Sequence, residues 1–479
     1  MWCVQRQASR PDKSSSTAHH AKYVFLFIGD GLGQVQTQTA ELYLNSSSAK
    51  LSALEYTAFP SKGFTSTYSS DSEETDSAAA CTAIACGIKT ITDRIAMDGS
   101  GTKACKTYAE YAKEHGRKTG IVSTTSLDHA TPACFYAHQP SRNAYHEIAM
   151  ELSGSNVDYF AGGGLRIPEK NNENAWNAIK EQGYRIISEK KEFTLLNPSS
   201  VKVYVTSNQY QEGKSLFYEI DRPPDQYSLA ELTKKGIELL YNEKGFFLMV
   251  EGGKIDWALH ANDAATAIRD IIAFNDAVRE AVQFYKLHPE ETLIVVTGDH
   301  EAGGMGLDAA HVEGKVFADL LNYQGMSFYS CTQIVQEYAK SHPRDAGNLS
   351  IFHALLGDVF GFHFRAKPRA LESSDEWGFV LTDDEVTQLQ EAFAQSMIPE
   401  KERMNNAKLY LLYEDYDPLT LIATRILDRR AGISWLSLSH TSTPVITYAL
   451  GVRHKLFAGS YDNTDIFKKM IVASGFSNP

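Results

Sequence analysis

Five short fragments of the chain carry the carboxylate, imidazole and hydroxyl side chains that bind metal ions and transfer phosphoryl groups. They are Gly29-Asp30-Gly31, Thr75-Asp76-Ser77-Ala78, His129-Ala130-Thr131-Pro132, Glu251-Gly252-Gly253-Lys254-Ile255-Asp256 with His260, and Thr297-Gly298-Asp299-His300 with His440-Thr441. Each fragment alone has an ordinary structural explanation. Oxygen and nitrogen ligands that recur at strand ends and helix starts are improbable in a structural protein, so together they predict a multi-metal site.

Ser77 precedes a run of alanines that predicts a helix. A serine at a helix N-terminus faces unpaired N–H groups, which favour an anionic phosphoryl group. Because a hydroxyl is a weak nucleophile near neutral pH, that role requires a neighbouring metal ion. The alternative is that this fragment only caps the helix.

The later fragments suit two kinds of ion. A spacing of four places Asp256 and His260 on one face of a predicted helix that runs to about residue 286, where both can bind one metal ion. The adjacent Asp299 and His300 suit zinc, whereas Glu251 suits an oxygen-preferring ion such as magnesium. The alternatives are a helix-capping aspartate with an incidental histidine, and a solvated loop at 299–300.

Apolar runs rich in β-forming residues predict the strands that position these fragments. They are Val24–Ile28, Thr119–Ser123, Val201–Val205, Phe246–Val250, Leu293–Thr297 and Val445–Leu450, with helical patterns between many of them. This alternation predicts an α/β fold with a mostly parallel sheet, whose ligands gather at the carboxyl ends of the strands. Asp30, Glu251 and Asp299 each lie within two residues of such an end. For Asp30, between two glycines, a turn aspartate that caps its own backbone is the alternative.

The region 305–430 interrupts this alternation with helical patterns at 331–341, 383–397 and 418–430. We interpret it as an insertion in a catalytic domain of residues 22–479. Because His300 and His440 bracket it, the insertion is expected to start and end at the rim of the site, as a cap or an oligomer contact. Residues 1–21 are polar and are expected to form a flexible segment without a visible signal peptide.

Composition narrows the class of protein. With 479 residues, 43% hydrophobic and 22% charged, the chain can bury a full globular core. Its formal net charge of −13 argues against a nucleic-acid-binding surface. No apolar run approaches the roughly 18 residues that a transmembrane helix requires. Cys86 and Cys105 flank a short loop and are either a disulfide or two unpaired small residues.

With these residues assembled, the chain resembles the alkaline phosphatases from Tyr23 to its final segment. The resemblance implies a three-layer α/β/α fold, a homodimer, and hydrolysis of small phosphate monoesters with inorganic phosphate as product. It also implies two zinc ions and one magnesium ion. The implied ligands are Asp256, His260 and His440 for the first zinc, Asp30, Asp299, His300 and Ser77 for the second, and Asp30, Thr131 and Glu251 for magnesium.

The same resemblance assigns further residues. Arg142 matches the arginine that holds phosphate, a role for which a guanidinium fork is suited. Asp76 and His129 are implied to lie behind or near the metal ligands. Trp257 departs from the family pattern, because many members have lysine or histidine there, and Ala302 replaces a histidine of other members. A Cys86–Cys105 disulfide and a periplasmic or extracellular location are also implied.

Other functions remain open at this stage. A phosphodiesterase or sulfatase of the wider superfamily shares the two-metal scaffold but typically lacks the Thr131–Glu251 magnesium set and Arg142. A phosphate or zinc binder without catalysis belongs to a different class, and hydrolysis of a monoester would exclude it. An adhesion role for the insertion is compatible with catalysis.

Overall fold

The computed structural model describes residues 19–46, 52–167, 169–200, 202–307, 314–342, 347–364 and 379–477. Its centre is one ten-stranded sheet. The strands, in sheet order, are β14 (Gly459–Asp462), β2 (Ser61–Ser66), β13 (Val445–Gly451), β8 (Thr292–Gly298), β1 (Tyr23–Gly29), β7 (Phe246–Gly252), β3 (Lys118–Ser123), β4 (Tyr159–Ala161), β6 (Val203–Val205) and β5 (Arg185–Ile187). All neighbouring pairs are parallel except those of β13, which runs antiparallel to β2 and β8.

Helices cover both faces of this sheet. Successive side chains of a single strand therefore pack into two different hydrophobic cores. Phe25 and Phe27 of β1 belong to one hydrophobic core, and Leu26 belongs to the other. The first core includes residues of α1 (Gln34–Ser46), α8 (Leu229–Leu240) and α10 (Ala264–Leu287). The second includes residues of α2 (Ser77–Cys86), α3 (Tyr108–Glu114), α5 (Tyr145–Gly154), α6 (Glu169–Glu181) and α17 (Thr464–Ser474). The predicted three-layer α/β/α fold is therefore confirmed.

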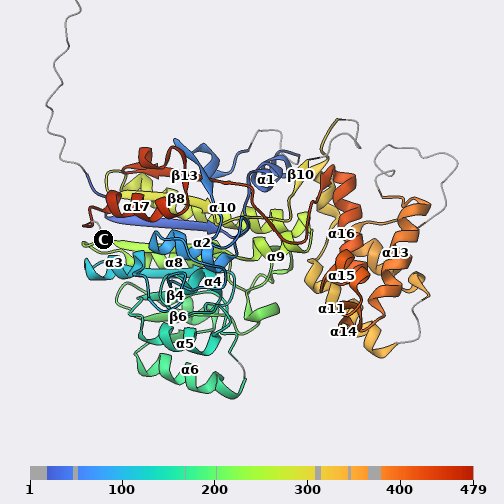
Figure 1. Ribbon diagram of the computed structural model, residues 1–479, viewed down its shortest axis with the longest axis horizontal. Helices are drawn as coiled ribbons and strands as arrows, with labels where there is room; N and C mark the ends of the chain where they lie inside the picture. The colour runs from blue at the N-terminus through green and yellow to red at the C-terminus, as the bar shows by residue number, and fades with distance from the viewer. Residues whose placement is uncertain are drawn as a thin grey trace, which may run out of the picture.

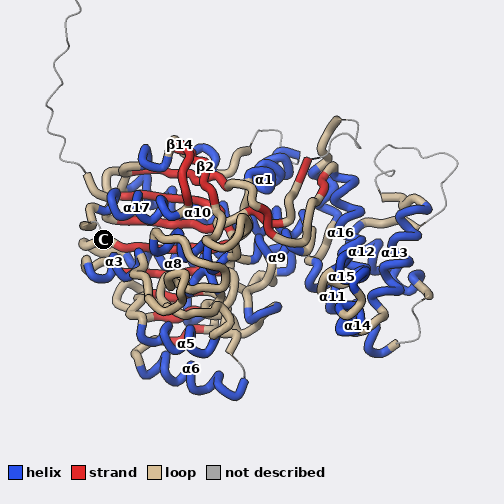
Figure 2. Tube along the Cα trace, in the orientation of Figure 1, coloured by secondary structure: helices blue, strands red, loops and turns tan. Residues whose placement is uncertain are grey.

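A group of helices stands apart from the sheet, at the right of Figure 1. It contains α11 (Phe328–Ser341), α12 (His353–Phe360), α13 (Asp383–Ser396), α14 (Glu400–Met404), α15 (Ala407–Tyr413) and α16 (Pro418–Ala431), which we call the cap. Figure 2 shows helices and loops there, whereas the long strands lie in the other part of the molecule. The predicted helices at 331–341, 383–397 and 418–430 correspond to α11, α13 and α16.

Two short antiparallel pairs connect the cap to the sheet-bearing part. Strand β9 (Glu301–Ala302) pairs with β12 (His440–Thr441), and β10 (Gly306–Leu307) pairs with β11 (Ile433–Ser434). The chain thus leaves the sheet after β8, builds the cap and returns beside the point of departure. None of the described helices is both long and apolar enough to cross a membrane.

The predicted single helix from Asp256 to about residue 286 is wrong, because two helices occupy this region. Helix α9 (Lys254–His260) ends before Asn262, which adopts a left-handed conformation with φ of 47°. Asp263 then caps α10 by accepting a hydrogen bond from Thr266 N at 2.9 Å. Asn and Asp favour such turns because their short side chains bond to nearby backbone.

The predicted disulfide between Cys86 and Cys105 is absent, and both residues are free thiols. The Cys86 Sγ lies 3.5 Å from the backbone oxygen of Cys105 and therefore points at the main chain. Burial raises the pKa of both thiols, that of Cys105 to about 11, which disfavours the reactive thiolate. The N-terminal segment predicted for 1–21 lies outside the described residues except for its last three positions.

Candidate active site

The carboxyl ends of three neighbouring strands bring buried acids together. Strand β1 lies between β7 and β8, with Gly29 opposite both Gly252 and Gly298. Asp30 and Asp299 follow their strands at the same level, and Glu251 lies one residue before the end of β7. Each of these acids is fully buried. Parallel register alone therefore places carboxylates that are more than 200 positions apart in sequence at one edge of the sheet.

Ser77 occupies the first turn of α2 beside these acids. The helix N-cap is Asp76, whose Oδ1 accepts from Ala79 N at 2.9 Å. Because the neighbouring aspartate caps the helix, the Ser77 hydroxyl is left for other contacts. Ser77 Oγ lies 3.4 Å from Asp30 Oδ1 and 3.3 Å from His300 Nε2.

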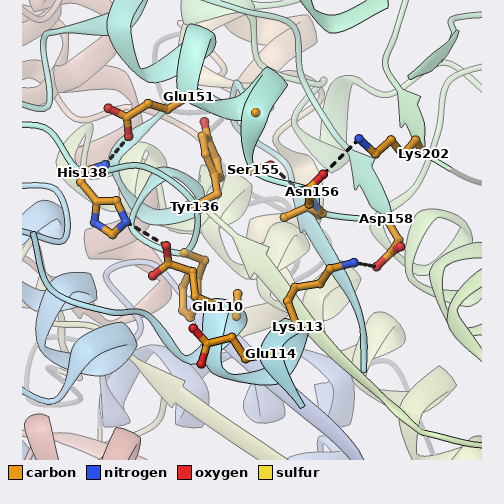
Figure 3. Close-up of a pocket in the computed structure, with 14 residues that line it drawn as sticks. Glu110, Lys113, Glu114, Tyr136, His138, Glu151, Ser155, Asn156, Asp158 and Lys202 are labelled. Carbon is orange, nitrogen blue, oxygen red and sulfur yellow. Dashed lines mark hydrogen bonds and ion pairs between the residues drawn. The ribbon is translucent and has the colours of Figure 1, made fainter. Parts of the chain in front are cut away.

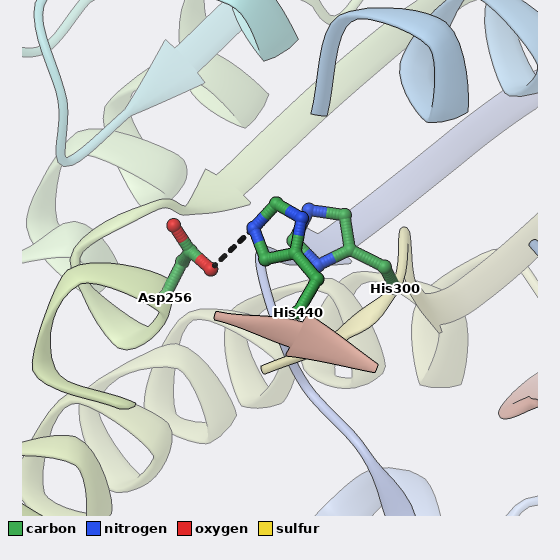
Figure 4. A group of neighbouring side chains, drawn as sticks. All are labelled: Asp256, His300 and His440. Carbon is green, nitrogen blue, oxygen red and sulfur yellow. Dashed lines mark ion pairs between the residues drawn. The ribbon is translucent and has the colours of Figure 1, made fainter. Parts of the chain in front are cut away.

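Three groups of side chains have ligand atoms within 4.8 Å of one another in the described part of the chain. They are Asp256, His300 and His440; Asp30, Asp299 and His300; and Asp30, His129 and Glu251. Figure 4 shows the first group, in which Asp256 comes from α9 and His440 from the short strand β12. The first and second groups share His300, and the second and third groups share Asp30. The three groups therefore form one continuous cluster.

Most residues of the implied zinc sets are together. Asp256 Oδ1 lies 3.3 Å from His260 Nε2 and 3.5 Å from His440 Nε2. The Nδ1 atoms of these histidines bond instead to backbone oxygens, that of His260 to Leu438 and that of His440 to Thr75. Such bonds orient the Nε2 atoms toward a shared point, as in metal-binding histidines. His300 joins this group although the sequence suggested it only for the second zinc.

The magnesium set is placed less directly. Asp30 and Glu251 lie together with His129, which the sequence placed only near the site. Helix α4 (Ala130–Ala133) starts after His129 and contains Thr131. The Thr131 Oγ1 is buried and has no hydrogen-bond partner within the described residues.

Unpaired buried oxygens indicate that the cluster is built for cations. The four carboxylates Asp30, Glu251, Asp256 and Asp299, which we call the site acids, each have one buried oxygen that accepts no hydrogen bond from the described residues. Those of Asp256 and Asp299 face only the imidazole nitrogens of the cluster, at 3.3 Å or more. Leaving such an atom unpaired costs about 1–3 kcal/mol, and more when it is charged. Divalent metal ions would satisfy all of these atoms, so the residues present fit the ions that the resemblance implies.

Burial and mutual repulsion act on the same acids. Burial, followed by the charges of Asp299, Asp256 and Glu251, raises the pKa of Asp30 well above its usual value. Burial likewise raises the pKa values of Glu251 and Asp299 to about 7. Burial also raises the pKa of Asp256, but the neighbouring His260 and His440 outweigh it and hold this pKa well below the usual range. The cluster as a whole therefore favours added positive charge.

Arg142 lies beside Ser77 through the residue that caps α2. Its Nη1 donates to Asp76 Oδ2 at 2.9 Å, and its Nη2 lies 3.2 Å from His129 Nε2. Burial, together with the positive charges of Arg142 and Arg166, lowers the pKa of His129 well below its usual value. A neutral His129 can accept a hydrogen bond from Arg142. Asp76 thus both caps the helix that begins with Ser77 and binds the Arg142 guanidinium next to it.

Trp257 and Lys254 line the other side of this region. The indole is partly buried and meets the His129 ring edge to face at 5.6 Å between centroids. Sequence reasoning gave Lys254 no role, yet it is fully buried. Its Nζ donates to Ser215 Oγ at 2.9 Å and lies 3.5 Å from the centre of the Tyr218 ring. The sequence did offer a signal for Lys254, because this lysine lies between Glu251 and Asp256, the two candidate metal ligands of the same fragment.

A cavity at another edge of the sheet carries no comparable chemistry. This cavity of about 860 Å³ is lined by residues that precede β4 and β6, at the amino ends of the strands (Figure 3). Its charged side chains are paired, for example Lys113 with Asp158 at 2.8 Å and His138 with Glu110 at 3.1 Å. The chemistry therefore belongs to the opposite edge of the sheet.

Comparison with known proteins agrees with this site. The family model for alkaline phosphatase matches residues 21–476. Alkaline phosphatase 3 of Bacillus subtilis (strain 168) is 32% identical, with 98% of this chain and 92% of that protein covered. A cold-active alkaline phosphatase from Shewanella sp. has a TM-score of 0.75 at 28% identity, covering 94% of this chain and 99% of that one.

A second solved structure, the alkaline phosphatase of Thermus thermophilus, also has a TM-score of 0.75. It is 26% identical, with 98% of this chain and 96% of that chain covered. The similarity therefore includes the cap as well as the sheet. A nearly full-length family match, together with the buried acid and histidine cluster beside a serine at a helix start, leads to one conclusion: the chain belongs to the alkaline phosphatase family and is a hydrolase.

Proposed function

We propose that this enzyme hydrolyses phosphate monoesters to an alcohol and inorganic phosphate through a phosphoserine at Ser77. Membership of the alkaline phosphatase family supports phosphomonoester hydrolysis as the reaction. The observation that carries the covalent intermediate is the position of the Ser77 hydroxyl, which is free of capping and lies within 3.4 Å of Asp30 and His300.

Two zinc ions and one magnesium ion are proposed for the cluster. The two groups that contain histidines with Asp256 and with Asp299 suit zinc, and the oxygen-rich group of Asp30 and Glu251 suits magnesium, with Thr131 completing it. When bound, these ions would lower the pKa of the reacting hydroxyl and water and stabilise the leaving oxygen. The Cys86–Cys105 pair has no part in this proposal.

The first half-reaction uses the serine oxygen. Ser77 gives up its hydroxyl proton to solvent as its Oγ attacks phosphorus, forming an O–P bond while the bond from phosphorus to the leaving oxygen breaks. The N–H groups at the start of α2 point toward the transferred group and favour its negative charge. Arg142, oriented by Asp76, is placed to donate two hydrogen bonds to the phosphoryl oxygens. The departing alkoxide takes a proton from solvent.

The second half-reaction returns the serine. Water attacks phosphorus, the bond from phosphorus to Ser77 Oγ breaks, and the serine regains its proton as phosphate departs. His129 stays neutral and holds the second Arg142 amino group, so the guanidinium keeps its orientation through both steps. The same groups therefore act on substrate and on covalent intermediate.

A trapping experiment tests this function directly. The metal-loaded enzyme is mixed with 4-nitrophenyl phosphate, quenched in acid within one turnover and digested for mass spectrometry. We expect one added phosphoryl group on the peptide that contains Ser77, and none in Ser77→Ala. Monoester turnover without any phosphorylated serine would contradict the covalent intermediate, and turnover of diesters only would contradict the substrate class.

A homodimer and a periplasmic or extracellular location are part of the same proposal. Both are supported only by the resemblance to the family. Light scattering of the purified enzyme tests the first, and fractionation of the cells that make it tests the second. A monomer at micromolar concentration, or activity confined to the cytoplasm, would contradict them.

A further inference from the structure

Arg166 lies on a loop that follows β4 and is attached to Asp128, the neighbour in sequence of the His129 that contacts Arg142. Three glycines, Gly162 to Gly164, and then Leu165 separate it from the strand. Its backbone N donates to Asp128 Oδ2 at 2.7 Å, so this loop is held next to the residue that precedes His129. A glycine run after a strand allows the backbone to approach its neighbours closely, and a β-carbon on Gly163 would lie 2.4 Å from the Lys214 oxygen.

The Arg166 side chain rests on aromatic and glycine surfaces. Its Cζ lies 4.9 Å from the centre of the Tyr145 ring, a cation–π contact. A β-carbon on Gly213 would be 3.4 Å from this Cζ and 3.3 Å from the outer edge of the Trp257 ring. The guanidinium and the indole therefore lie side by side over Gly213, which is itself in a left-handed conformation with φ of 57°.

The Arg166 guanidinium has no carboxylate partner among the described residues. Arg142 forms its ion pair with Asp76, but none of the described residues forms a hydrogen bond or ion pair with the Arg166 guanidinium. Arg166 is exposed. It is nevertheless near the site, because it joins Arg142 among the charges that act on His129. A free guanidinium held by its ring contact is preorganised for an anion from solution.

We propose that Arg166 binds a second oxyanion, carried by the leaving group of the substrate, while Arg142 holds the phosphoryl group. The inference rests on the proposed function and names its substrate class as monoesters whose leaving group carries a carboxylate or another phosphate. Trp257 lies beside the Arg166 guanidinium over Gly213 and beside His129, which contacts Arg142, so the apolar part of the leaving group would cross the indole. A planar fork can bind either anion through two hydrogen bonds.

The test compares matched substrates. Glycerol 3-phosphate and 3-phosphoglycerate differ by a carboxylate, and fructose 6-phosphate and fructose 1,6-bisphosphate differ by a phosphate. For each pair, the ratio of kcat/KM values, anionic over neutral, is measured in the wild type, Arg166→Gln and Arg166→Glu. Arg185→Gln is the control, because Arg185 is an exposed arginine on edge strand β5 and its loss changes the net charge equally.

We expect Arg166→Gln to lower the ratio about threefold to tenfold in at least one pair, as an exposed charge-assisted contact predicts. Arg166→Glu should lower it further, and Arg185→Gln should leave it as in the wild type. Added salt should lower the wild-type ratio more than that of Arg166→Gln. Which pair responds identifies the anion as carboxylate or phosphate.

Unchanged ratios in both pairs and both Arg166 variants, with all four esters hydrolysed, would overturn the role of Arg166 and leave the proposed function intact. Failure of the wild type to hydrolyse any of the four esters would instead contradict the proposed function. An equal fall of the ratio in Arg185→Gln would also overturn the inference, because it would show that net charge alone sets the preference.

Discussion

Two regions of this molecule bury carboxylates, and they do so in different ways. The site acids gather at the strand ends, and each has a buried oxygen that accepts no hydrogen bond from the described residues. Asp263 and Asp428, which we call the junction acids, lie where α10 meets the cap. Asp263 accepts from Thr266 N at 2.9 Å, Phe328 N at 2.9 Å and Gln324 Nε2 at 2.8 Å.

The comparison separates a binding site from a structural junction. Burial raises the pKa of Asp263 and of Asp30 alike, so a raised pKa does not distinguish the two regions. Hydrogen-bond pairing distinguishes Asp263, because both of its oxygens face N–H or O–H donors of this chain. Asp428, in contrast, has a buried Oδ1 without a hydrogen-bond partner among the described residues. An unpaired oxygen marks a place for an external cation only where further ligand atoms lie within 4.8 Å of it, as they do at the site acids, whereas the paired oxygens of Asp263 hold two parts of the chain together.

The largest effect is expected at the nucleophile. Ser77→Ala should lower monoester kcat by roughly 10³-fold or more, because the covalent step is lost. The midpoint of urea unfolding should stay near that of the wild type, since the cap of α2 is Asp76 and the alanine retains the helix start. Steady-state kinetics and urea titration measure the two quantities. Retention of a tenth of the activity, about 1.4 kcal/mol in barrier, would rule out the serine.

Removal of metal should affect the site acids and spare the junction. A chelator should lower activity at least about a hundredfold and lower the melting temperature, because ions that bind only the folded state stabilise it. Zinc with magnesium should restore both. Hydrogen exchange should increase around Asp30 and Asp299 and not at the start of α10. Full activity after exhaustive chelation would show that the unpaired oxygens have another purpose.

The reverse pattern is expected for Asp263→Ala. The change removes the cap of α10, leaves Phe328 N without its acceptor and takes away one acceptor of Gln324 Nε2, which should cost about 2–4 kcal/mol of unfolding free energy. The kcat per folded molecule should change by less than about threefold, which corresponds to about 0.6 kcal/mol in the activation free energy. Urea unfolding and active-site titration check this. Unchanged stability with lost activity would make the junction part of the site.

The smallest effect concerns the pH dependence of stability. Burial, followed by the charge of Asp263, raises the pKa of Asp428 well above its usual value. The folded state then binds the proton more tightly than the unfolded state, so this contribution is complete below the unfolded pKa of about 3.9 and is lost as pH rises through the folded pKa. In Asp428→Asn, which cannot titrate, that loss should disappear.

The unfolding free energies of the wild type and of Asp428→Asn, both metal-replete, are measured at several pH values above about 4. The wild type should lose stability relative to the variant as pH rises. A constant difference between the two proteins would mean that Asp428 does not change its protonation between the folded and unfolded states in this range.

Much of the site followed from sequence because strands and their ends are local features. The apolar runs before Asp30 and Asp299 became β1 and β8, and parallel pairing then placed the two acids together. The short strand β2, Ser61–Ser66, contains few apolar residues and was not predicted, nor were β4, β5 and β14. Such strands depend on their neighbours in the sheet more than on their own sequence.

Other features of the site could not be predicted, because the sequence alone is compatible with more than one local structure. Asp76 and Ser77 are both good capping residues, and only the folded chain shows that the aspartate caps while the serine stays free. The break between α9 and α10 was missed because apolar periodicity continues across Asn262 and Asp263. Arg166 resembled any surface arginine until its loop was placed against Trp257.

The short β9–β12 pairing makes the proposed ligands unequal in their attachment. Asp30 and Asp299 extend from the central sheet, whereas His440 is joined to the site by a ladder of two residue pairs at the base of the cap. Rocking of the cap would therefore be transmitted to one ion position and hardly to the other. Such a molecule would exchange its ions at two different rates, and the length and stiffness of the cap would set the faster one.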